Sequence, residues 1–346
     1  MTVLGIETSC DETSAAVVRD GREVLSCVVH TQPEHRRWGG VVPELASRCH
    51  AERLPGIVRA AVEESGAGWA GIDVVAATRG PGLASSLLVG WSMAKGIALR
   101  TGLPLVAVNH IEAHLHSVFL DPAAPPPEAC RPMVGLAVSG GHTNLFSVRA
   151  GGGLELLGRT VDDAAGEALD KAAKLLGLGY PGGPVIDRVS RGLVPEEGVF
   201  PEGRLHGGVA PAGLDPELCT SFSGLKTALL HRVTASPPRS EADVARLACD
   251  YQAAVVGALV RRCELALERT GARFLAVGGG VSLNSSLRAR LAAMCETRGV
   301  RLLLALPKHC GDNAAMIAGL AGTGRGVRSP ESFDLDVDPS WAVSSR

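Results

Sequence analysis

Short apolar runs alternate with polar or glycine-containing segments through most of the chain, and their order predicts an α/β protein. Residues 3–29 read as strand, polar loop, strand, tight turn and strand. Residues 133–161 repeat this order, and an offset of 130 places Gly5 on Gly135. Strands bounded by such turns form antiparallel meanders. The pattern therefore predicts an internal duplication.

Each meander is followed by further helices and then by a strand, a glycine corner, a helix and another strand. In the first half these are residues 74–77, 80–82, 85–100 and 105–108; in the second half they are 274–277, 278–280, 285–297 and 301–304. Two α/β lobes of similar plan that face one cleft are the simplest architecture for this order.

The boundaries of the lobes follow from composition. We expect an N-terminal lobe over 1–120 and a second lobe over 132–312, joined by the proline-rich connector 121–127. The helix at about 313–323 is expected to pack back on the first lobe. The polar segment 324–346 is expected to be a flexible tail.

Composition excludes several classes of protein. Hydrophobic residues make up 46% of the 346 residues, which supports a real core, and aromatic residues only 3%, which argues against base stacking on aromatic platforms. The net charge of −2 excludes a globally basic nucleic-acid binder. Local basic edges stay open, and the candidates are Lys171, Lys174, Arg188 and Arg191, and His35, Arg36, Arg37, Arg48 and Arg53.

The nine cysteines are scattered, odd in number and never spaced as C-x-x-C. This usage indicates reduced thiols and not a disulfide framework or a cysteine-rich zinc module. The chain begins with a strand-like run and contains no signal-peptide pattern and no apolar stretch long enough to span a membrane. We therefore expect a cytoplasmic protein.

Two histidines in the run Asn109–His116 are candidate metal ligands. On a helix, His110 and His114 would share one face, with their Cβ atoms about 5–6 Å apart. That spacing suits two imidazoles on one ion, although a plain pair of helix-face histidines is the alternative. The only acid of the run, Glu112, stands two residues after His110, so the pattern is not the H-E-x-x-H of zinc proteases.

A third ligand is available in the run Gly311-Asp312-Asn313, just before an apolar helical segment. Asp312 lies where a helix N-cap is common, so a purely structural cap is the alternative to a metal ligand. His309 and Cys310 are rival ligands from the same stretch.

Three glycine corners are candidates for holding a phosphate or a sugar, because glycine lets backbone amides approach an anion. They are residues 80–82, 139–143 and 278–284, the last with Asn284 at its edge. None matches the P-loop pattern. The polar loop 7–14 also holds Asp11 and Glu12, which are candidates to orient a metal or a reacting amine.

Eight motifs occur in an order that resembles the bacterial TsaD family, also called Gcp or YgjD, over about residues 2–322. The motifs are residues 7–14 (ETSCDETS), 39–44 (GGVVPE), 80–83 (GPGL), 109–114 (NHIEAH), 138–143 (VSGGHT), 162–171 (DDAAGEALDK), 280–284 (GVSLN) and 311–313 (GDN). Each motif alone is weak, but eight in order are specific.

The resemblance implies the duplicated ribonuclease-H-like ASKHA fold of actin, hexokinase and Hsp70, with a central cleft. It implies transfer of a threonylcarbamoyl group from threonylcarbamoyl-AMP to N6 of adenosine 37 in tRNAs that read ANN codons. It also implies partners: tRNA, a shorter paralogue (TsaB) and a P-loop ATPase (TsaE). A small-molecule kinase of the same fold, a metalloprotease and a pure binding module are the alternatives.

The resemblance also assigns residues. His110, His114 and Asp312 match the family's ligands for one divalent metal, Fe²⁺ ahead of Zn²⁺. The residues that match its substrate contacts are Ala137, Val138, Ser139, Gly140, Gly141, Asp170, Gly183, Asp187 and Asn284. Archaeal relatives carry a metal-contacting Tyr where this chain has Ala137, so a more open site is expected. Asp11 is the candidate that positions or deprotonates the amine.

Overall fold

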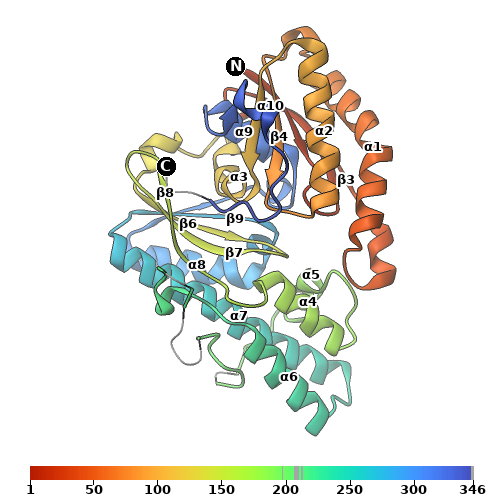
Figure 1. Ribbon diagram of the computed structural model, residues 1–346. Helices are drawn as coiled ribbons and strands as arrows, with labels where there is room; N and C mark the ends of the chain where they lie inside the picture. The colour runs from red at the N-terminus through yellow and green to blue at the C-terminus, as the bar shows by residue number, and fades with distance from the viewer. Residues whose placement is uncertain (197, 206–209, 212, 344–346) are drawn as a thin grey trace. The chain divides into compact units, whose positions relative to one another are not determined.

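The structure is a computed structural model that describes residues 1–196, 198–205, 210–211 and 213–343. The described chain divides into two compact units. The first consists of Met1–Pro125 and Ala305–Val343, and the second begins at Pro126 and ends at Leu304. Each unit is built on one mixed sheet (Figure 1).

The sheet of the first unit has the strand order β11-β5-β4-β1-β2-β3. Its strands are β1 (Thr2–Glu7), β2 (Glu12–Arg19), β3 (Glu23–Thr31), β4 (Val74–Gly80), β5 (Leu105–Asn109) and β11 (Val327–Arg328). β1, β2 and β3 form the predicted antiparallel meander, and β4 and β5 continue the sheet in parallel with β1. The short β11 pairs antiparallel with β5.

Helices cover both faces of this sheet because its central strands are apolar on both sides. The helices are α1 (Pro43–Glu64), α2 (Ala84–Thr101), α3 (His110–His116), α9 (Ala314–Gly322) and α10 (Glu331–Asp334). Leu4 and Ile6 of β1 pack with α1 and α2, whereas Val3 packs with α9 on the opposite face. A Cβ at Gly5 would lie 2.5 Å from the backbone oxygen of Ala314, so glycine permits this close approach.

The sheet of the second unit has the strand order β10-β9-β6-β7-β8. Its strands are β6 (Met133–Val138), β7 (Thr143–Val148), β8 (Leu154–Arg159), β9 (Phe274–Gly278) and β10 (Arg301–Leu304). Its helices are α4 (Ala165–Leu175), α5 (Gly182–Val189), α6 (Ser223–Ala235), α7 (Glu241–Thr270) and α8 (Ser285–Arg298). The core joins the strands to α4, α7 and α8, and includes the buried Tyr251.

The predicted duplication is confirmed by strand order and register. In the first unit Gly5 pairs with Ala16, and in the second Gly135 pairs with Phe146, so both partners are offset by 130. The remaining regular elements are short 3-10 helices: Pro33–Trp38, Trp69–Gly71, Ser117–Leu120, Pro127–Cys130, Pro216–Leu218, Gly280–Leu283 and Pro307–His309.

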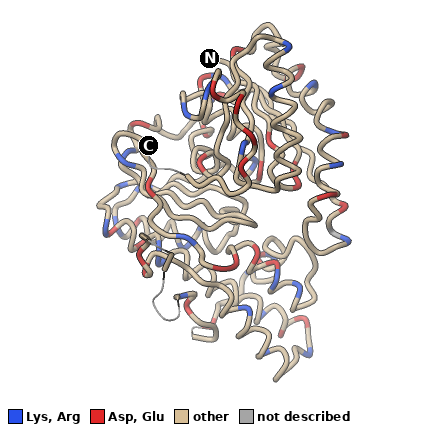
Figure 2. The backbone as a smooth tube through the Cα atoms, in the orientation of Figure 1, with Lys and Arg blue, Asp and Glu red and all other residues tan. Residues whose placement is uncertain are grey.

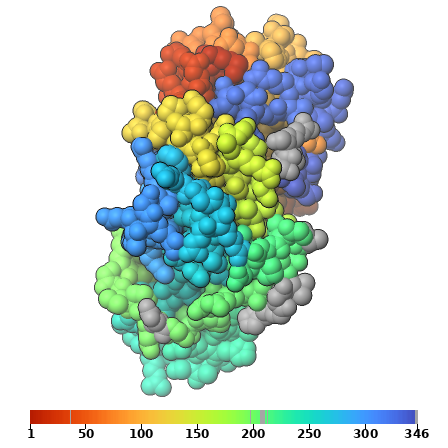
Figure 3. Space-filling model, turned by 90° about the vertical axis from the view of Figure 1, so that its left-hand side faces the viewer, coloured from red at the N-terminus to blue at the C-terminus, as the bar shows by residue number. Residues whose placement is uncertain are grey.

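The C-terminal segment differs from the flexible tail that the sequence predicts. The Trp91 indole N–H donates to the backbone oxygen of Leu335 at 3.1 Å, and the Asn109 side chain donates to that of Trp341 at 3.0 Å. Phe333, Leu335 and Trp341 also pack on the core of the first unit. In Figure 3 this dark blue segment lies against the orange and red atoms of the same unit. A few spaced apolar side chains hold the segment, although its average composition is polar.

Residues 305–312, which the sequence places in the second lobe, also belong to the first unit. They lead directly into α9, and α9 packs on β1 and β2. All nine cysteines are free thiols. No helix in the described ranges combines the length and the apolar character needed to cross a membrane.

Candidate metal centre

The centre begins where β5 passes directly into α3. Asn109 ends the strand, and its side chain caps the helix by accepting from the backbone N–H groups of Ile111 (3.0 Å) and Glu112 (3.2 Å). His110 is the first residue of α3, and His114 follows one turn later on the same face. Both imidazoles are buried.

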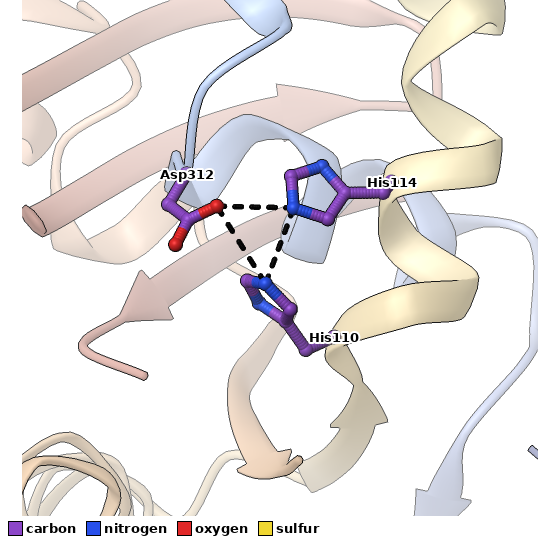
Figure 4. Close-up of side chains that lie close together, drawn as sticks. All are labelled: His110, His114 and Asp312. Atoms are coloured by element: carbon purple, nitrogen blue, oxygen red, sulfur yellow. Dashed lines mark hydrogen bonds and ion pairs between the residues drawn. The ribbon is translucent and has the colours of Figure 1, made fainter. Parts of the chain in front are cut away.

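Asp312 completes a cluster of three side chains (Figure 4). The Nε2 atom of His114 lies 3.0 Å from Asp312 Oδ1 and 3.1 Å from His110 Nε2, and the third pair, His110 Nε2 and Asp312 Oδ1, is 3.6 Å apart. In the described part of the chain, this is the set of at least three His, Cys, Asp or Glu side chains that can hold a metal ion.

The cluster forms because Asp312 is not the cap of the helix that follows it. Asn313 caps α9, accepting from the backbone N–H of Met316 at 3.2 Å. The structural alternative for Asp312 is therefore wrong, and its carboxylate, 18% exposed, lies beside the two histidines.

These donor atoms fit a divalent metal. Tetrahedral ligands with bonds of about 2.1 Å lie about 3.4 Å from one another, and the observed separations are 3.0, 3.1 and 3.6 Å. Two Nε2 atoms that face each other can share only one proton, whereas an ion uses both lone pairs. Two imidazoles and one carboxylate suit zinc or ferrous iron. The residues present therefore fit such an ion.

The electrostatic surroundings are acidic. Burial disfavours the charged ring of His110, but the carboxylates of Asp312 and Glu7 outweigh it and raise the pKa of His110 to about 9. Burial, with the charges of Asp312 and Asp11, raises the pKa of Glu12 well above its usual range. Several carboxylates thus lie close to one another, and a bound cation would reduce the repulsion between their negative charges.

The polar loop 8–11 lies beside the cluster. Burial raises the pKa of the Cys10 thiol, and the negative charges of Asp11 and Asp312 raise it further, so Cys10 is close to both carboxylates. A buried network holds this loop. The Nε2 atom of His50 lies 2.9 Å from the backbone oxygen of Cys10, and its Nδ1 lies 2.7 Å from the Thr13 hydroxyl. The loop that carries Asp11 is therefore held near the three-residue cluster by α1, on which His50 lies.

The rival ligands have other surroundings. Burial, with the charge of Lys308, lowers the pKa of His309 to about 4, and no described group bonds to either ring nitrogen. The Cys310 thiol lies 3.3 Å from the backbone oxygens of Ala305 and Leu306. Glu112 pairs with Arg325, away from the histidines, so the base of a zinc protease is missing.

The second unit holds the other set of predicted contacts. Ala137 and Val138 end β6, and the loop that follows is closed by a hydrogen bond from the Ser139 N–H to the backbone oxygen of His142 (2.8 Å). Gly140 and Gly141 are exposed, and a Cβ at either would meet nothing within 4 Å. The N–H groups of the first turn of α4 donate to Ser139 and Gly140. The loop is thus an open glycine corner.

The side chains of Asp170 and Asp187 bind groups at the N-termini of neighbouring helices. Asp170 Oδ1 accepts from the N–H groups of Gly182 (2.6 Å) and Gly183 (3.3 Å) at the start of α5. Asp187 accepts from the Ser285 hydroxyl at 2.7 Å, which ties α5 to α8.

Asn284 also has structural partners. Its Oδ1 caps α8 through the N–H of Leu287 (2.9 Å), and its amide N–H donates to Gln252 Oε1 (2.7 Å). β6 and β9 are parallel neighbours, so the loops that carry Ser139 and Asn284 leave the sheet at the same edge.

The glycine corner at 80–82 is occupied by the chain itself. The Gly82 N–H donates to the backbone oxygen of Pro339 (3.1 Å), and the Leu83 N–H donates to that of Ser9 (2.8 Å). A Cβ at Gly80 would lie 1.8 Å from the backbone oxygen of Asp338. This corner therefore packs the C-terminal segment and has no space for an anion.

The two basic edges are partly compensated. Lys171 pairs with Asp163 (2.5 Å) and Glu167 (2.9 Å). On α1, Arg48 and Arg53 alternate with glutamates, and Figure 2 shows both signs of charge along this helix.

Sequence reasoning missed two residues of the centre. Glu7 is fully buried at the end of β1, with Oε2 3.1 Å from His110 Nδ1. Thr78, at the end of β4, donates to the same Glu7 oxygen at 2.5 Å. The available signal was a carboxylate that closes an otherwise apolar strand.

Comparison with known proteins gives consistent matches in sequence. A family model described as tRNA N6-adenosine threonylcarbamoyltransferase (TsaD) matches residues 23–319. A protein of that name from Geobacter sp. (strain M21) is 48% identical over 344 residues, covering 99% of this chain and 97% of its own. One from Anaeromyxobacter dehalogenans (strain 2CP-C) is 50% identical and covers 99% of both chains. These relatives give no support to the kinase alternative.

Solved structures show the fold. HypF in a phosphate- and nucleotide-bound form has a TM-score of 0.61 at 12% identity, over 93% of this chain and 46% of its own. Component A of the (R)-2-hydroxyglutaryl-CoA dehydratase of Acidaminococcus fermentans has a TM-score of 0.53 at 14% identity, over 93% and 96%. Together with the duplicated sheets, these likenesses show the two-lobed ASKHA fold.

Proposed function

This chain belongs to the tRNA N6-adenosine threonylcarbamoyltransferase family, and we propose that its His110–His114–Asp312 cluster is the metal centre of that reaction. The enzyme forms N6-threonylcarbamoyladenosine (t6A) in tRNA. The finer proposal is that the donor is threonylcarbamoyl-AMP and the acceptor is adenosine 37 of tRNAs that read ANN codons.

The observation that supports a metal centre most strongly is the convergence of three ligand atoms from distant parts of the chain. Asp312 Oδ1 lies 3.0 Å from a histidine 198 residues earlier, and the two ring nitrogens face each other. Fe²⁺ is our first candidate and Zn²⁺ the second, in the order that the family resemblance implies, and the donor set suits both.

A divalent metal bound there would act as a Lewis acid that polarises the carbamoyl carbonyl. The chain supplies the rest of the arrangement. His110 and His114 are fixed by one helix turn, and Asp312 contributes the single negative charge of the ligand set. With only three protein ligands, room is left for substrate.

The open corner of the second unit is proposed to bind the adenylate. Backbone amides of Gly140 and Gly141 would face its phosphate, which glycine permits because no side chain blocks the approach, and Ser139 holds the loop closed through its N–H. Val138 and Ala137 lie beneath this corner, and Gly183 lies at the start of α5. Asp170, Asp187 and Asn284 hold the surrounding helix N-termini in place.

Asp11 is proposed to orient or deprotonate the adenine amine. Its neighbour Glu12 has a raised pKa, caused mainly by burial, and hydrogen-bonds to Asp11. A protonated Glu12 would donate to Asp11 and leave it an acceptor for an amine proton.

We also propose a cytoplasmic location and two protein partners, a shorter paralogue (TsaB) and a P-loop ATPase (TsaE). The net charge of −2 supports shared binding of tRNA, since one near-neutral chain provides few phosphate contacts.

Mass spectrometry of nucleosides from bulk tRNA tests the function. Host cells depleted of the protein should lose t6A, and the wild-type gene should restore it while His110→Ala should not. Unchanged t6A at full depletion would contradict the assigned reaction. Restoration by His110→Ala would contradict the metal centre alone.

A further inference from the structure

Glu7 is the most deeply buried acid beside the proposed metal centre. It ends β1 and is 0% exposed. An unpaired carboxylate in such a place costs several kcal/mol or takes up a proton. Its surroundings therefore have to supply hydrogen-bond donors.

Three donors surround the Glu7 carboxylate. The Ser9 backbone N–H donates to Oε1 at 2.5 Å, and the Thr78 hydroxyl donates to Oε2 at 2.5 Å. The Nδ1 atom of His110 lies 3.1 Å from Oε2. Each Glu7 oxygen thus accepts a hydrogen bond from a donor other than His110, the Ser9 N–H on Oε1 and the Thr78 hydroxyl on Oε2, as a carboxylate does.

The hydrogen bonds around Glu7 fix which nitrogen of His110 carries the proton. A carboxylate oxygen only accepts, so Nδ1 carries an N–H, and Nε2, which faces His114 and Asp312, is the nitrogen left to bind a metal. The Ser9 hydroxyl, 3.2 Å from Nδ1, adds a second contact on the same side of the ring.

We infer that Glu7 is a positioning residue that holds His110 in the tautomer and orientation needed to bind a metal through Nε2. The inference rests on the proposed metal centre. β1 therefore takes part in the metal site through Glu7, although Glu7 is not a ligand. The spacing of the ligands along the chain does not indicate this, because Glu7 lies 103 residues before His110.

The substitution Glu7→Gln tests this role with little change in shape. A glutamine has one acceptor oxygen for three donors, and its amide group either opposes the Ser9 N–H or displaces the proton from His110 Nδ1. We expect Co²⁺ to bind about 10- to 100-fold more weakly, measured by the visible absorption of cobalt titrated into the metal-free full chain.

Glu112→Gln is the matched control. Glu112 is also a largely buried acid and lies on the same helix as His110, but its side chain pairs with Arg325. Its variant should bind Co²⁺ as the wild type does. Equal affinity of Glu7→Gln and wild type, with the metal-free proteins melting alike, would overturn the inference.

A second measurement needs no variant and decides the case if Glu7→Gln does not fold. In wild-type protein labelled with ¹⁵N-histidine and loaded with ¹¹³Cd²⁺, His110 should carry its proton on Nδ1 and couple to cadmium through Nε2. The reverse pattern would overturn the role of Glu7. A wild type that binds neither Co²⁺ nor Cd²⁺ would overturn the proposed metal centre itself and this inference with it.

Discussion

The two units share one strand order and one register, yet the corresponding loops carry opposite chemistry. The offset of 130 places Glu7 on Ala137, Asp11 on Gly141 and Glu12 on His142. The first loop gathers carboxylates near two histidines, and the second is an open glycine corner. A duplicated scaffold has thus kept its hydrogen-bonded frame while the residues at the strand ends diverged, to carboxylates in the first unit and to alanine, glycine and histidine in the second.

The same contrast appears at the next strand. Register places Thr78 of β4 on Gly278 of β9, since Ala76 and Ala276 pair with Gly5 and Gly135 respectively. Thr78 donates to Glu7. In the second unit Ala137 stands at the position of Glu7, so a threonine hydroxyl at position 278 would have no carboxylate to bond. The chain has Gly278 at that position.

Removal of a metal ligand should give the largest effect and should act through the first unit alone. His114→Ala leaves two of three ligands, so metal affinity should fall by more than about 100-fold, beyond what a supporting residue costs, and t6A formation should stop. Metal content after dialysis and a tRNA nucleoside assay measure this. His116→Ala is the control, because His116 contacts the Gly21 backbone oxygen and not the cluster; equal loss in both variants would contradict a local metal effect.

Acid should destabilise the first unit through His309. Its pKa is lowered to about 4, chiefly by burial, so between about pH 6.5 and 4 the unfolded chain binds more protons than the folded one. Stability should fall as pH decreases through this window, by about 2 kcal/mol from pH 7 to 5. In denaturant unfolding, the free energy of unfolding of His309→Leu should depend less on pH than that of the wild type. Replacement of the exposed His231 in the second unit should leave the pH dependence unchanged.

A carboxylate placed in the open glycine corner of the second unit should weaken the binding of the donor's phosphate there. Gly141→Asp copies Asp11 into the second unit, where a side chain meets nothing within 4 Å and folding should continue. The negative charge should raise the KM for the adenylate donor on the order of tenfold, about 1.4 kcal/mol, with metal content unchanged. Gly141→Ala separates bulk from charge; an equal rise in KM for both variants would argue against anion binding.

Removal of either of two asparagine N-caps should give the smallest effects, and each variant should affect a different assay. Asn313→Ala and Asn284→Ala each remove an N-cap, so each should cost about 1 kcal/mol of stability. Only Asn313→Ala should weaken metal binding, because Asn313 holds the turn next to Asp312. Only Asn284→Ala should raise the KM for the donor. The same response in both assays from either variant would mean that the two loops do not act separately.

Local signals made much of the fold predictable. The strands of both meanders, the helices after the glycine corners and the repeat of 130 follow from hydrophobic periodicity and turn residues, which act over a few positions. The pairing of His110 with His114 was predictable for the same reason, since one helix turn fixes it.

Contacts over long sequence separation were not predictable in this way. Whether Asp312 caps a helix or faces the histidines depends on the neighbouring Asn313, which took the cap. The fate of the corner at 80–82 depended on the C-terminal segment, whose Pro339 and Asp338 fill the space around it.

The sequence by itself determined the elements, their repeat and the pair of neighbouring histidines on α3, because these depend on spacing along the chain. Only the tertiary structure decided that Glu7 supports His110 and that Asp312 joins it, because sheet order brings together strand ends far apart in sequence. A buried carboxylate is stable only where hydrogen-bond donors meet it, and the three donors that meet Glu7 come from separate segments that only the packed sheet brings together.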